Sequence, residues 1–422
     1  MKKLAIAILS LPSNFSFSSE KKIPVVLGRA VVILLILILF LVEISRVYLV
    51  MPFPGSQRKE TVDIAHWIST HIVWIRILTF TMIGIALIRV FKQGKLWEKI
   101  TLPLVLVAYI PVFALFNYRF DAESIFHQPA NKSFVPVAAS IDKSKLVIGI
   151  VVNGEAKAYP IQLIGYHHQV MDTVGNEPII ITYCTVCRTG RAYSTLVNGR
   201  YESFRLVGMD HFNAVFEDET TKTWWQQATG KAIAGPLKGS ALKEIPSHQL
   251  TINSWMRQYP NSMVMEPDSL YEERYFKLED YDRGTMQSPL VKRDYRPWQP
   301  KSWVVGVKNE FSAVAYDWNE LVKKRLIQDS LQDLPILLAM ESDTTSFHVY
   351  DRRINGSVLQ FNSSISGNCL TDWNTNSTWN MDGLCIEGVL KGQRLIRVQA
   401  YNEFWHAWKT FQVNTKKYVS SQ

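Results

Sequence analysis

The sequence lacks several features that would assign it to a familiar functional class. Cysteine is scarce, with four in 422 residues, and two of these form a single C-x-x-C pair, Cys184 and Cys187. Arg188 follows the pair, so the C-x-x-C-H motif of c-type haem attachment is absent. No nucleotide-binding motif occurs. The net charge is +9, but no basic stripe with interleaved aromatic residues accompanies it, so nucleic-acid binding is not predicted.

Apolar residues are concentrated in three long runs near the N-terminus, Pro24–Val50, Ile72–Phe91 and Ile100–Phe116. Each run is long enough to cross a hydrocarbon layer of ~30 Å as a helix. A buried core helix of a globular domain seldom stays apolar for so long. We therefore predict three transmembrane spans within residues 23–118, with the lipid bilayer as their partner, after an N-terminal segment of residues 1–22.

Lysine and arginine near the spans predict the orientation, because cytoplasmic loops carry an excess of these residues. They crowd the segment before the first span and the short connection between the second and third: Lys2, Lys3, Lys21, Lys22, Arg29, Arg89, Lys92, Lys95 and Lys99. We expect a multi-pass protein of the cytoplasmic (inner) membrane, with a cytoplasmic N-terminus and an extracytoplasmic C-terminal domain. The competing interpretation, a cleaved signal peptide at the N-terminus, lacks an A-x-A cleavage site.

One cation falls inside the second span. Arg76 is costly in hydrocarbon unless it pairs with another group or lines a cavity. Glu43, near the end of the first span, is its candidate partner, and such a pair would serve helix packing.

Beyond Asn131 the sequence repeats itself. Two blocks align along their whole length, Val147–Ile164 and Val304–Leu321, and further matches follow in the same order. We predict one domain present twice, in residues 131–265 and 303–415, with a connector in residues 266–302. Short β-like runs with turn signals indicate that each copy is mainly antiparallel. The predicted fold class is therefore a three-span α-helical transmembrane region followed by a mainly β (β-rich α+β) extracytoplasmic domain of two duplicated copies.

The residues around Gly175-Asn176 predict a β-hairpin that places a histidine beside the first cysteine. A Gly-Asn pair is a permitted two-residue hairpin loop, and it sets His167 opposite Cys184. Residues that face each other across a hairpin have Cβ atoms ~4.5–5.5 Å apart. A His167 imidazolium would then favour the thiolate of Cys184.

Two other patterns bear on the same place. The strong hairpin signal at Asn198-Gly199, extended along its strands, brings His211 towards Cys187. In the second copy, the positions of the first histidine and the first cysteine hold Lys324 and Glu341. An opposite-charge pair is what two facing positions would carry.

Three chemistries are open for Cys184 and Cys187. Outside the cytoplasm the pair could cycle between dithiol and disulfide with a redox partner, as a thiol-dependent oxidoreductase. It could bind a transition metal, copper or zinc, with His167 and His211 as further ligands. It could also be an inert staple in a non-catalytic binding or scaffold module. A thioredoxin fold is not predicted, because that motif opens a helix and this pair leads into further β-formers.

The other two cysteines, Cys369 and Cys385, have no counterparts in the first copy. Outside the cytoplasm they could form a disulfide across a polar loop or stay unpaired. The sequence leaves both alternatives open.

Four blocks of the sequence resemble the uncharacterised domain-of-unknown-function family 3179: "YHHQVMDTVGNEPIIITYCTVC", "WWQQATGKAIAGPLKGSAL", "TINSWMRQYP" and "EFWHAWKTF". The resemblance covers both copies. Relatives typically read W-H-E-x-V-N-D-T, then a strand and Y-C-P-x-C. The resemblance implies that His167, Cys184 and Cys187 are the site residues. It implies the fold and a site but no reaction, because the family has no established activity.

The resemblance also covers a D…W-x-Q block, which implies supporting roles for three residues, Asp218, Trp225 and Gln227. The sequence departs from the family pattern at three positions: His168, Met171 and Thr185 stand where Glu, Asn and Pro are usual. Thiol redox chemistry is the favoured function, and metal handling or a scaffold role are the alternatives.

Overall fold

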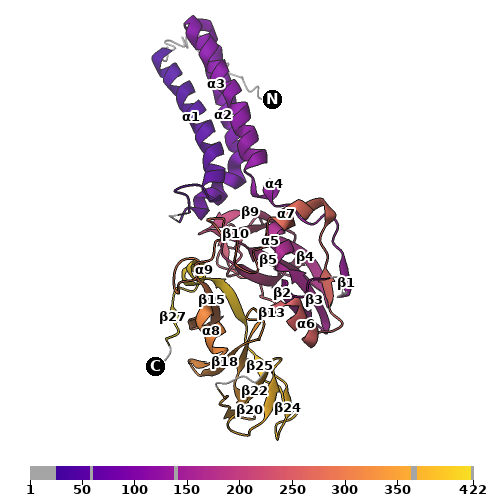
Figure 1. The fold of residues 1–422 in the computed structure, drawn as a ribbon. Coiled ribbons are helices and arrows are strands. Elements are labelled where there is room, and N and C mark those ends of the chain that lie inside the picture. Colours follow the sequence, from indigo (N-terminus) through magenta and orange to yellow (C-terminus); the bar gives the residue numbers. More distant parts are fainter. Residues whose placement is uncertain (1–24, 58–59, 137–140, 363–367, 420–422) are drawn as a thin grey trace, which may run out of the picture. The chain divides into compact units, whose positions relative to one another are not determined.

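The computed structural model describes residues 25–57, 60–136, 141–362 and 368–419 (Figure 1). The predicted N-terminal segment of residues 1–22 lies outside the described residues. The chain divides into two compact units. The helical unit takes its described residues from 1–43 and 71–113, and the strand-rich unit takes its own from 44–70 and 114–422.

Three long helices carry the apolar runs: α1 (Val25–Tyr48), α2 (Val62–Gln93) and α3 (Leu96–Ala114), which continues into a π-helical turn, η1 (Leu115–Arg119). By length and composition, all three are able to cross a membrane. Large apolar side chains such as Leu34 and Ile110 are more than half exposed. Three apolar helices of this kind are compatible with a membrane anchor.

A buried ion pair joins two of these helices. Arg76 donates from Nε and Nη2 to the two carboxylate oxygens of Glu43, at 2.6 and 2.8 Å. The hydroxyl of Tyr109 donates to the same carboxylate at 2.6 Å, and Glu43 is completely buried. The predicted pairing of Arg76 with Glu43 is therefore confirmed, and it ties α1, α2 and α3 together.

The strand-rich unit contains small sheets and short helices, as the sequence predicts. Before the connector, the described residues form four sheets. The first has the strand order β1 (Phe134–Pro136), β14 (Met263–Met265), β3 (Glu155–Pro160), β2 (Leu146–Val152) and β13 (Ser247–Thr251), and the second has β4 (Gln169–Val174), β5 (Glu177–Cys184) and β6 (Thr189–Ser194). The third has β12 (Ala232–Ala234), β11 (Trp224–Gln226), β10 (Asn213–Asp218) and β9 (Phe204–Asp210), and the fourth pairs β7 (Leu196–Val197) with β8 (Arg200–Tyr201). Their helices are α4 (Ala122–Ile125), α5 (Ile161–His167) and α6 (Ile252–Gln258).

The connector holds a 3-10 turn, η2 (Ser269–Tyr271), and α7 (Glu272–Phe276). The sheets that follow are β26 (Ala400–Phe404), β15 (Trp303–Lys308), β16 (Ala313–Asp317) and β27 (Thr415–Lys417); β17 (Leu326–Leu331), β18 (Leu334–Met340), β19 (Phe347–Asp351) and β25 (Ile396–Arg397); β20 (Arg353–Ile354) with β21 (Ser357–Val358); and β22 (Cys369–Thr371), β23 (Thr378–Asn380) and β24 (Cys385–Glu387). Their helices are α8 (Trp318–Lys324) and α9 (Trp405–Phe411).

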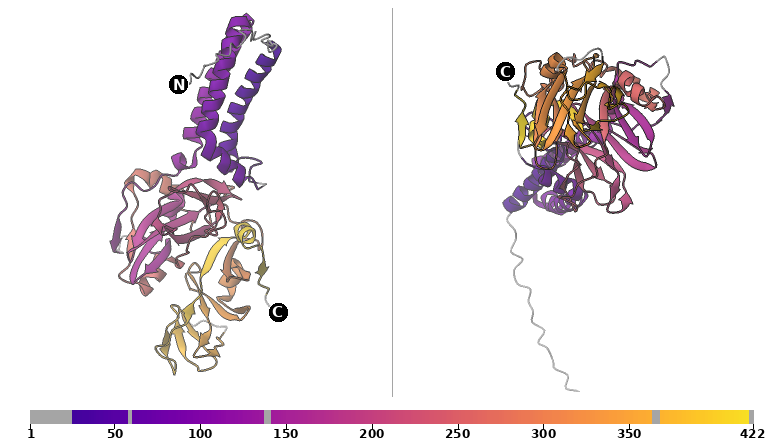
Figure 2. Two further views of the ribbon diagram at one scale, coloured as in Figure 1. Left: turned by 180° about the vertical axis from the view of Figure 1, so that it is seen from behind. Right: turned by 90° about the horizontal axis from the view of Figure 1, so that it is seen from below.

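Within the strand-rich unit, the part before the connector (magenta) and the part after it (orange to yellow) form two adjacent lobes in Figure 1 and in both views of Figure 2. We call them the first lobe and the second lobe. Pairing is antiparallel except for β3 with β14 and β16 with β27, which are parallel. The predicted hairpin at Asn198-Gly199 is confirmed: both residues have positive φ, 49° and 79°, and they join β7 to β8.

The buried pair in the helical unit makes a prediction about stability. Replacing Arg76 alone with leucine leaves the Glu43 carboxylate buried without its cation, which typically costs about 3–5 kcal/mol. Replacing both residues with leucine removes both charges and should cost much less. Thermal unfolding of the purified chain in detergent compares the two variants. Equal destabilisation by the single and the double replacement would contradict this account of the pair.

Candidate functional site

The hairpin that leads to the cysteines has the predicted register. Gly175 and Asn176 both have positive φ, 55° and 64°, and form the two-residue turn between β4 and β5. Val170 faces Ile181, as the turn position requires. The pairing of β4 with β5 runs back from the turn as far as Gln169 and Thr182.

The predicted contact between His167 and Cys184 does not form. His167 is the last residue of α5, and His168 caps this helix in the left-handed conformation, with φ 62°. The β4 strand begins only after this reversal, so His167 is not part of the ladder. Its Nε2 lies 2.6 Å from the hydroxyl of Tyr275, and its Nδ1 lies 2.5 Å from the carbonyl of His127. Burial lowers the pKa of His167, so the ring favours its neutral form.

In the second lobe, too, a residue in the left-handed conformation separates the helix from the next strand. Arg325 caps α8 with φ 61°, and the next strand starts after it. Lys324 pairs with Glu320 at 2.9 Å, while Glu341 binds Arg257 and the ring of His348. The expected pairing of Lys324 with Glu341 is therefore wrong, for the same reason as in the first lobe.

The two cysteines close a tight turn between two strands. Cys184 ends β5, and the backbone N–H of Cys187 donates to the carbonyl of Cys184 at 3.2 Å. Arg188 has φ 57°, and β6 starts at Thr189, which pairs with Cys184. The pair thus lies in a β-turn and not at the start of a helix, in agreement with the sequence.

Both thiols point at one acceptor. The Sγ atoms of Cys184 and Cys187 lie 3.4 and 3.2 Å from the backbone carbonyl of Phe212, and both cysteines are unpaired and completely buried. Phe212 and His211 form the two-residue turn between β9 and β10, with φ 63° and 48°. Because both thiols share one acceptor, their sulfurs lie near each other. Each contact is individually weak, since a thiol is a weak donor.

A buried lysine also contacts the turn: Lys301, from the end of the connector. Its Nζ donates to the carbonyl of Val186 at 2.6 Å and lies 3.2 Å from Nε2 of His406. Burial lowers the pKa of Lys301 to about 8, against the attraction of the two thiolates. Burial also lowers the pKa of His406, to about 4, so His406 is neutral near pH 7.

The two thiols are electrostatically unequal. A hydrogen bond from the Cys187 thiol lowers the pKa of Cys184, with further help from backbone N–H groups and Lys301. Burial raises the pKa of Cys187, and the Cys184 thiolate raises it further. Cys184 is therefore the sulfur that ionises first.

Residues of β26, in the second lobe, bind the cysteine turn and the start of β6. Arg188 donates to the side chain of Asn402 at 2.6 Å, and its guanidinium lies 3.6 Å from the ring centroid of Trp303. Arg191 pairs with Glu403 at 2.5 Å, and both side chains are 1% exposed. The N–H of residue 404 donates to the carbonyl of Cys187 at 3.0 Å. The turn from Cys184 to Arg188, which we call the thiol turn, is thus held in place by residues of both lobes.

The family-derived supporting residues divide into two groups. Trp225 donates to Asp218 at 2.9 Å, and in the second lobe Trp379 donates to Asp372 at the same distance, so this pair is a framework contact. Gln227 has a more local role. Its amide nitrogen donates to Thr182 and to the carbonyl of Thr189, and its amide oxygen accepts from Asn213. Gln227 therefore fixes the ends of the thiol turn relative to β10.

The predicted four-ligand metal set is not assembled. The ring of His211 pairs with Asp210 at 2.9 Å, and His167 is engaged with Tyr275. Among the residues that the structure describes, no group of three or more His, Cys, Asp and Glu side chains is arranged to hold a metal ion.

The other two cysteines are unpaired. Cys369 in β22 faces Asn380, and Cys385 in β24 faces Trp379, so the central strand β23 lies between them. Strands are spaced by about 4.8 Å, and a disulfide requires Cα atoms within about 7 Å. The Cys369–Cys385 disulfide that the sequence left open is therefore not formed, because the two residues sit on opposite sides of a strand.

Comparison with known proteins identifies the family. The family described as "Protein of unknown function (DUF3179)" matches residues 125–415, which is more than half of the chain, so the chain belongs to this family. No curated protein and no solved structure matches it. The family resemblance of the sequence is confirmed, and the function rests on the site itself.

Three groups beside the two cysteines were not predictable from the sequence motifs. Lys301 lies in a charged connector among other basic residues, and nothing there marks it as buried. His406 lies within the family-like block "EFWHAWKTF", but nothing in that block indicates that the histidine contacts the cysteine turn. The third group is the backbone carbonyl of Phe212, which carries no side-chain signature.

The electrostatics predict which cysteine reacts first. In the reduced chain, Cys184 should be alkylated before Cys187. Lys301→Met removes the nearby cation and should raise the apparent pKa of Cys184 by on the order of one unit, or ~1.4 kcal/mol. This assistance should fade as pH rises through about 8, where Lys301 loses its proton. The control is Lys308→Met, at a half-buried lysine of the second lobe.

The measurement is the pH dependence of iodoacetamide labelling, resolved by peptide mass spectrometry. His167→Gln should leave the rate unchanged, because its ring contacts Tyr275. A pKa that follows His167 and ignores Lys301 would show that the assignment of the activating cation is wrong.

Proposed function

We propose that this chain is a membrane-anchored, extracytoplasmic thiol–disulfide redox protein whose reactive pair is Cys184 and Cys187. The convergence of both thiols on the carbonyl of Phe212 carries this proposal. It holds two reduced sulfurs together without exposed surface, where loss of two electrons and two protons would join them as a disulfide. The unequal pKa values support Cys184 as the attacking thiol and Cys187 as the resolving one.

A β-turn suits this role because little has to move. A disulfide requires the two Cβ atoms to lie about 3.5–4.5 Å apart. The hydrogen bond across the turn and the side chain of Gln227 hold the two backbone segments in both redox states. Lys301 would stabilise the thiolate when the bond opens.

Metal handling is the second candidate, and the surroundings of the thiols favour a soft cation. Met51, Met171 and Met209 lie in the same apolar cluster as Cys184 and Cys187. Thiolate and thioether ligands select copper(I). In this alternative, the two thiolates would bind copper(I) without the histidines that the sequence suggested.

The membrane position is part of the proposal. Three helices able to cross a membrane support an anchor, and the lysine and arginine distribution supports a cytoplasmic N-terminus. The strand-rich unit would then face an oxidising compartment, where a dithiol can cycle. A reporter that is active only outside the cytoplasm should be active when fused after Gln422 and silent when fused after Gly94. The reverse pattern would contradict the orientation.

We also propose that the two lobes arose by duplication, within the predicted limits of residues 131–265 and 303–415. The element order supports it: β2, β3, α5, β4, β5 and β6 in the first lobe correspond to β15, β16, α8, β17, β18 and β19 in the second. In each lobe a tryptophan lies flat on a strand glycine. A Cβ added at Gly149 would meet Trp255 at 2.3 Å, and one added at Gly306 would meet Trp408 at 2.4 Å.

Thiol counting with metal analysis separates the two candidate functions. The chain is purified in detergent with Cys369→Ser and Cys385→Ser, so that only the site cysteines remain. The redox proposal predicts that mild oxidation removes both thiols together and that a reductant restores them. Reversible loss of the one remaining thiol in Cys184→Ser under the same oxidation, or one bound copper per chain that Cys184→Ser abolishes, would contradict the redox proposal. If the thiols neither oxidise nor bind metal, the pair is a structural element.

A further inference from the structure

The thiols are enclosed on several sides. Cys184 and Cys187 have no exposed surface, and the apolar cluster that contains them also includes Phe212 of the β9–β10 turn, Ala407 of α9 and Met51 of the segment after α1. These three elements, which we call the cover, come from different parts of the chain. A reactant must therefore pass between them or displace one of them.

The cover is fastened at the β9–β10 hairpin. The N–H of Met209 donates to the carbonyl of Val50 at 2.6 Å, and the N–H of Phe212 lies 3.3 Å from the side-chain oxygen of Gln57. Gly208 allows this close approach, because an added Cβ would lie 2.6 Å from Val50. These two hydrogen bonds thus attach the β9–β10 hairpin to the segment that follows α1.

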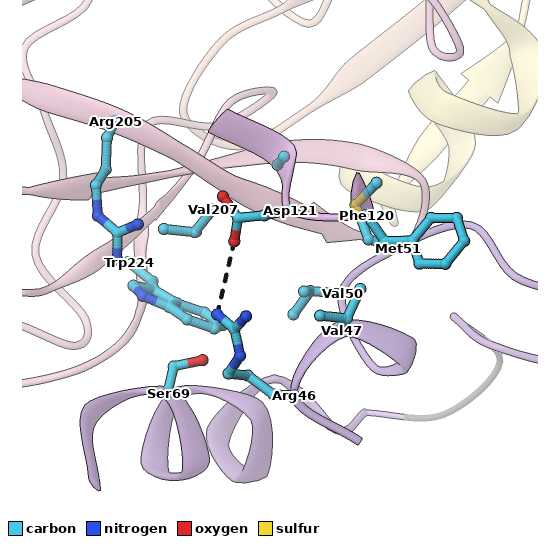
Figure 3. A pocket seen from close by; sticks show the side chains of 11 residues that line it. Arg46, Val47, Val50, Met51, Ser69, Phe120, Asp121, Arg205, Val207 and Trp224 are labelled. Atoms are coloured by element: carbon cyan, nitrogen blue, oxygen red, sulfur yellow. Dashed lines mark ion pairs between the residues drawn. The ribbon is translucent and has the colours of Figure 1, made fainter. Parts of the chain in front are cut away.

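The anchoring segment is itself held by an ion pair. Figure 3 shows Arg46 directed at Asp121, with Val47, Val50 and Met51 beside them. The Arg46 guanidinium lies 3.6 Å from the Asp121 carboxylate and also donates to the carbonyl of residue 116 at 2.8 Å. The cover over the thiols is therefore continuous with a hydrogen-bonded framework.

This enclosure decides which oxidants can reach the pair. Exchange with a disulfide requires attacking, central and leaving sulfurs to come together, with the carbon chains that carry them. A protein disulfide or a tripeptide disulfide cannot do so while Phe212 and Ala407 stay in place. A neutral molecule of nearly the size of water needs only small fluctuations of the cover.

We infer that the oxidant of this dithiol is a small hydroperoxide, hydrogen peroxide being the simplest, and this inference rests on the proposed redox function. The Cys184 thiolate attacks one peroxide oxygen, the O–O bond breaks, and Cys184 becomes a sulfenic acid. The departing hydroxide takes a proton from the Lys301 ammonium and leaves as water.

The second step completes the balance. The sulfur of Cys187 attacks the sulfur of Cys184, the S–O bond breaks, and the hydroxyl departs with the Cys187 proton as a second water. The proton that Lys301 donates is the one that it took from the Cys184 thiol when the thiolate formed, so the lysine ends as the neutral amine with which it began. Overall, the dithiol gives two electrons to one peroxide and forms one disulfide and two waters.

The experiment compares oxidants on the reduced full-length chain in detergent, with Cys369→Ser and Cys385→Ser. Hydrogen peroxide should form the Cys184–Cys187 disulfide at least tenfold faster than glutathione disulfide, a barrier difference of about 1.4 kcal/mol. With Cys187→Ser added, dimedone should trap a sulfenic acid on Cys184, read by mass spectrometry.

A cover variant makes the size argument specific. Phe212→Ala keeps the carbonyl but opens the cover, so it should speed oxidation by glutathione disulfide and change the peroxide rate little. Phe311→Ala, at a side chain that is 76% exposed, is the control and should change neither rate.

Two results would overturn the inference. One is a wild-type chain that glutathione disulfide oxidises as fast as peroxide does. The other is a chain that peroxide leaves reduced although diamide closes the disulfide, in which case the proposed redox function survives and the peroxide inference fails. If diamide closes no disulfide either, the proposed function fails with it.

Discussion

The two thiols of the site depend on one acceptor, the backbone carbonyl of Phe212, and both cysteines have no exposed surface. A buried carbonyl without a partner costs about 1–3 kcal/mol, so carbonyl and thiols satisfy one another. The carbonyl can point inward only because His211 and Phe212 both adopt left-handed backbone conformations. Such a conformation costs about 1–3 kcal/mol for a bulky residue and persists where the surroundings enforce it. The bonds from the hairpin to Val50 and Gln57 supply that enforcement.

The second lobe completes the site in the first lobe. Arg188 ends the thiol turn and Arg191 follows it in β6. They are held by Asn402 and Glu403 of the second lobe, so the turn cannot be treated as a module of one lobe. Losing one partner of a buried ion pair typically costs about 3–5 kcal/mol. Where the first lobe has Cys184, the second has Glu341 bound to a histidine and an arginine. One lobe carries an ionic cluster at this place and the other carries the thiols.

Much of the fold followed from local patterns, and the site followed only in part. Gly175-Asn176 was enough to predict the register of β4 with β5, because a two-residue turn leaves one pairing. The prediction for His167 was wrong because the ladder was extended through His168, whose left-handed conformation ends α5. Arg76 and Glu43 were predictable as partners because a charge in an apolar run needs one. Lys301 was not, since only the tertiary fold buries it and brings it to the thiol turn.

The most direct test of the central claim is a redox titration of the full-length chain in detergent, with Cys369→Ser and Cys385→Ser. The chain is incubated in dithiothreitol buffers of graded potential until the thiol count no longer changes. It is then unfolded, and the remaining thiols are alkylated and counted by mass spectrometry. If Cys184 and Cys187 are a redox pair, a single two-electron transition is expected, in which both thiols are lost together. Two thiols that remain alkylatable at every potential, in a chain that circular dichroism shows to be folded, would contradict it.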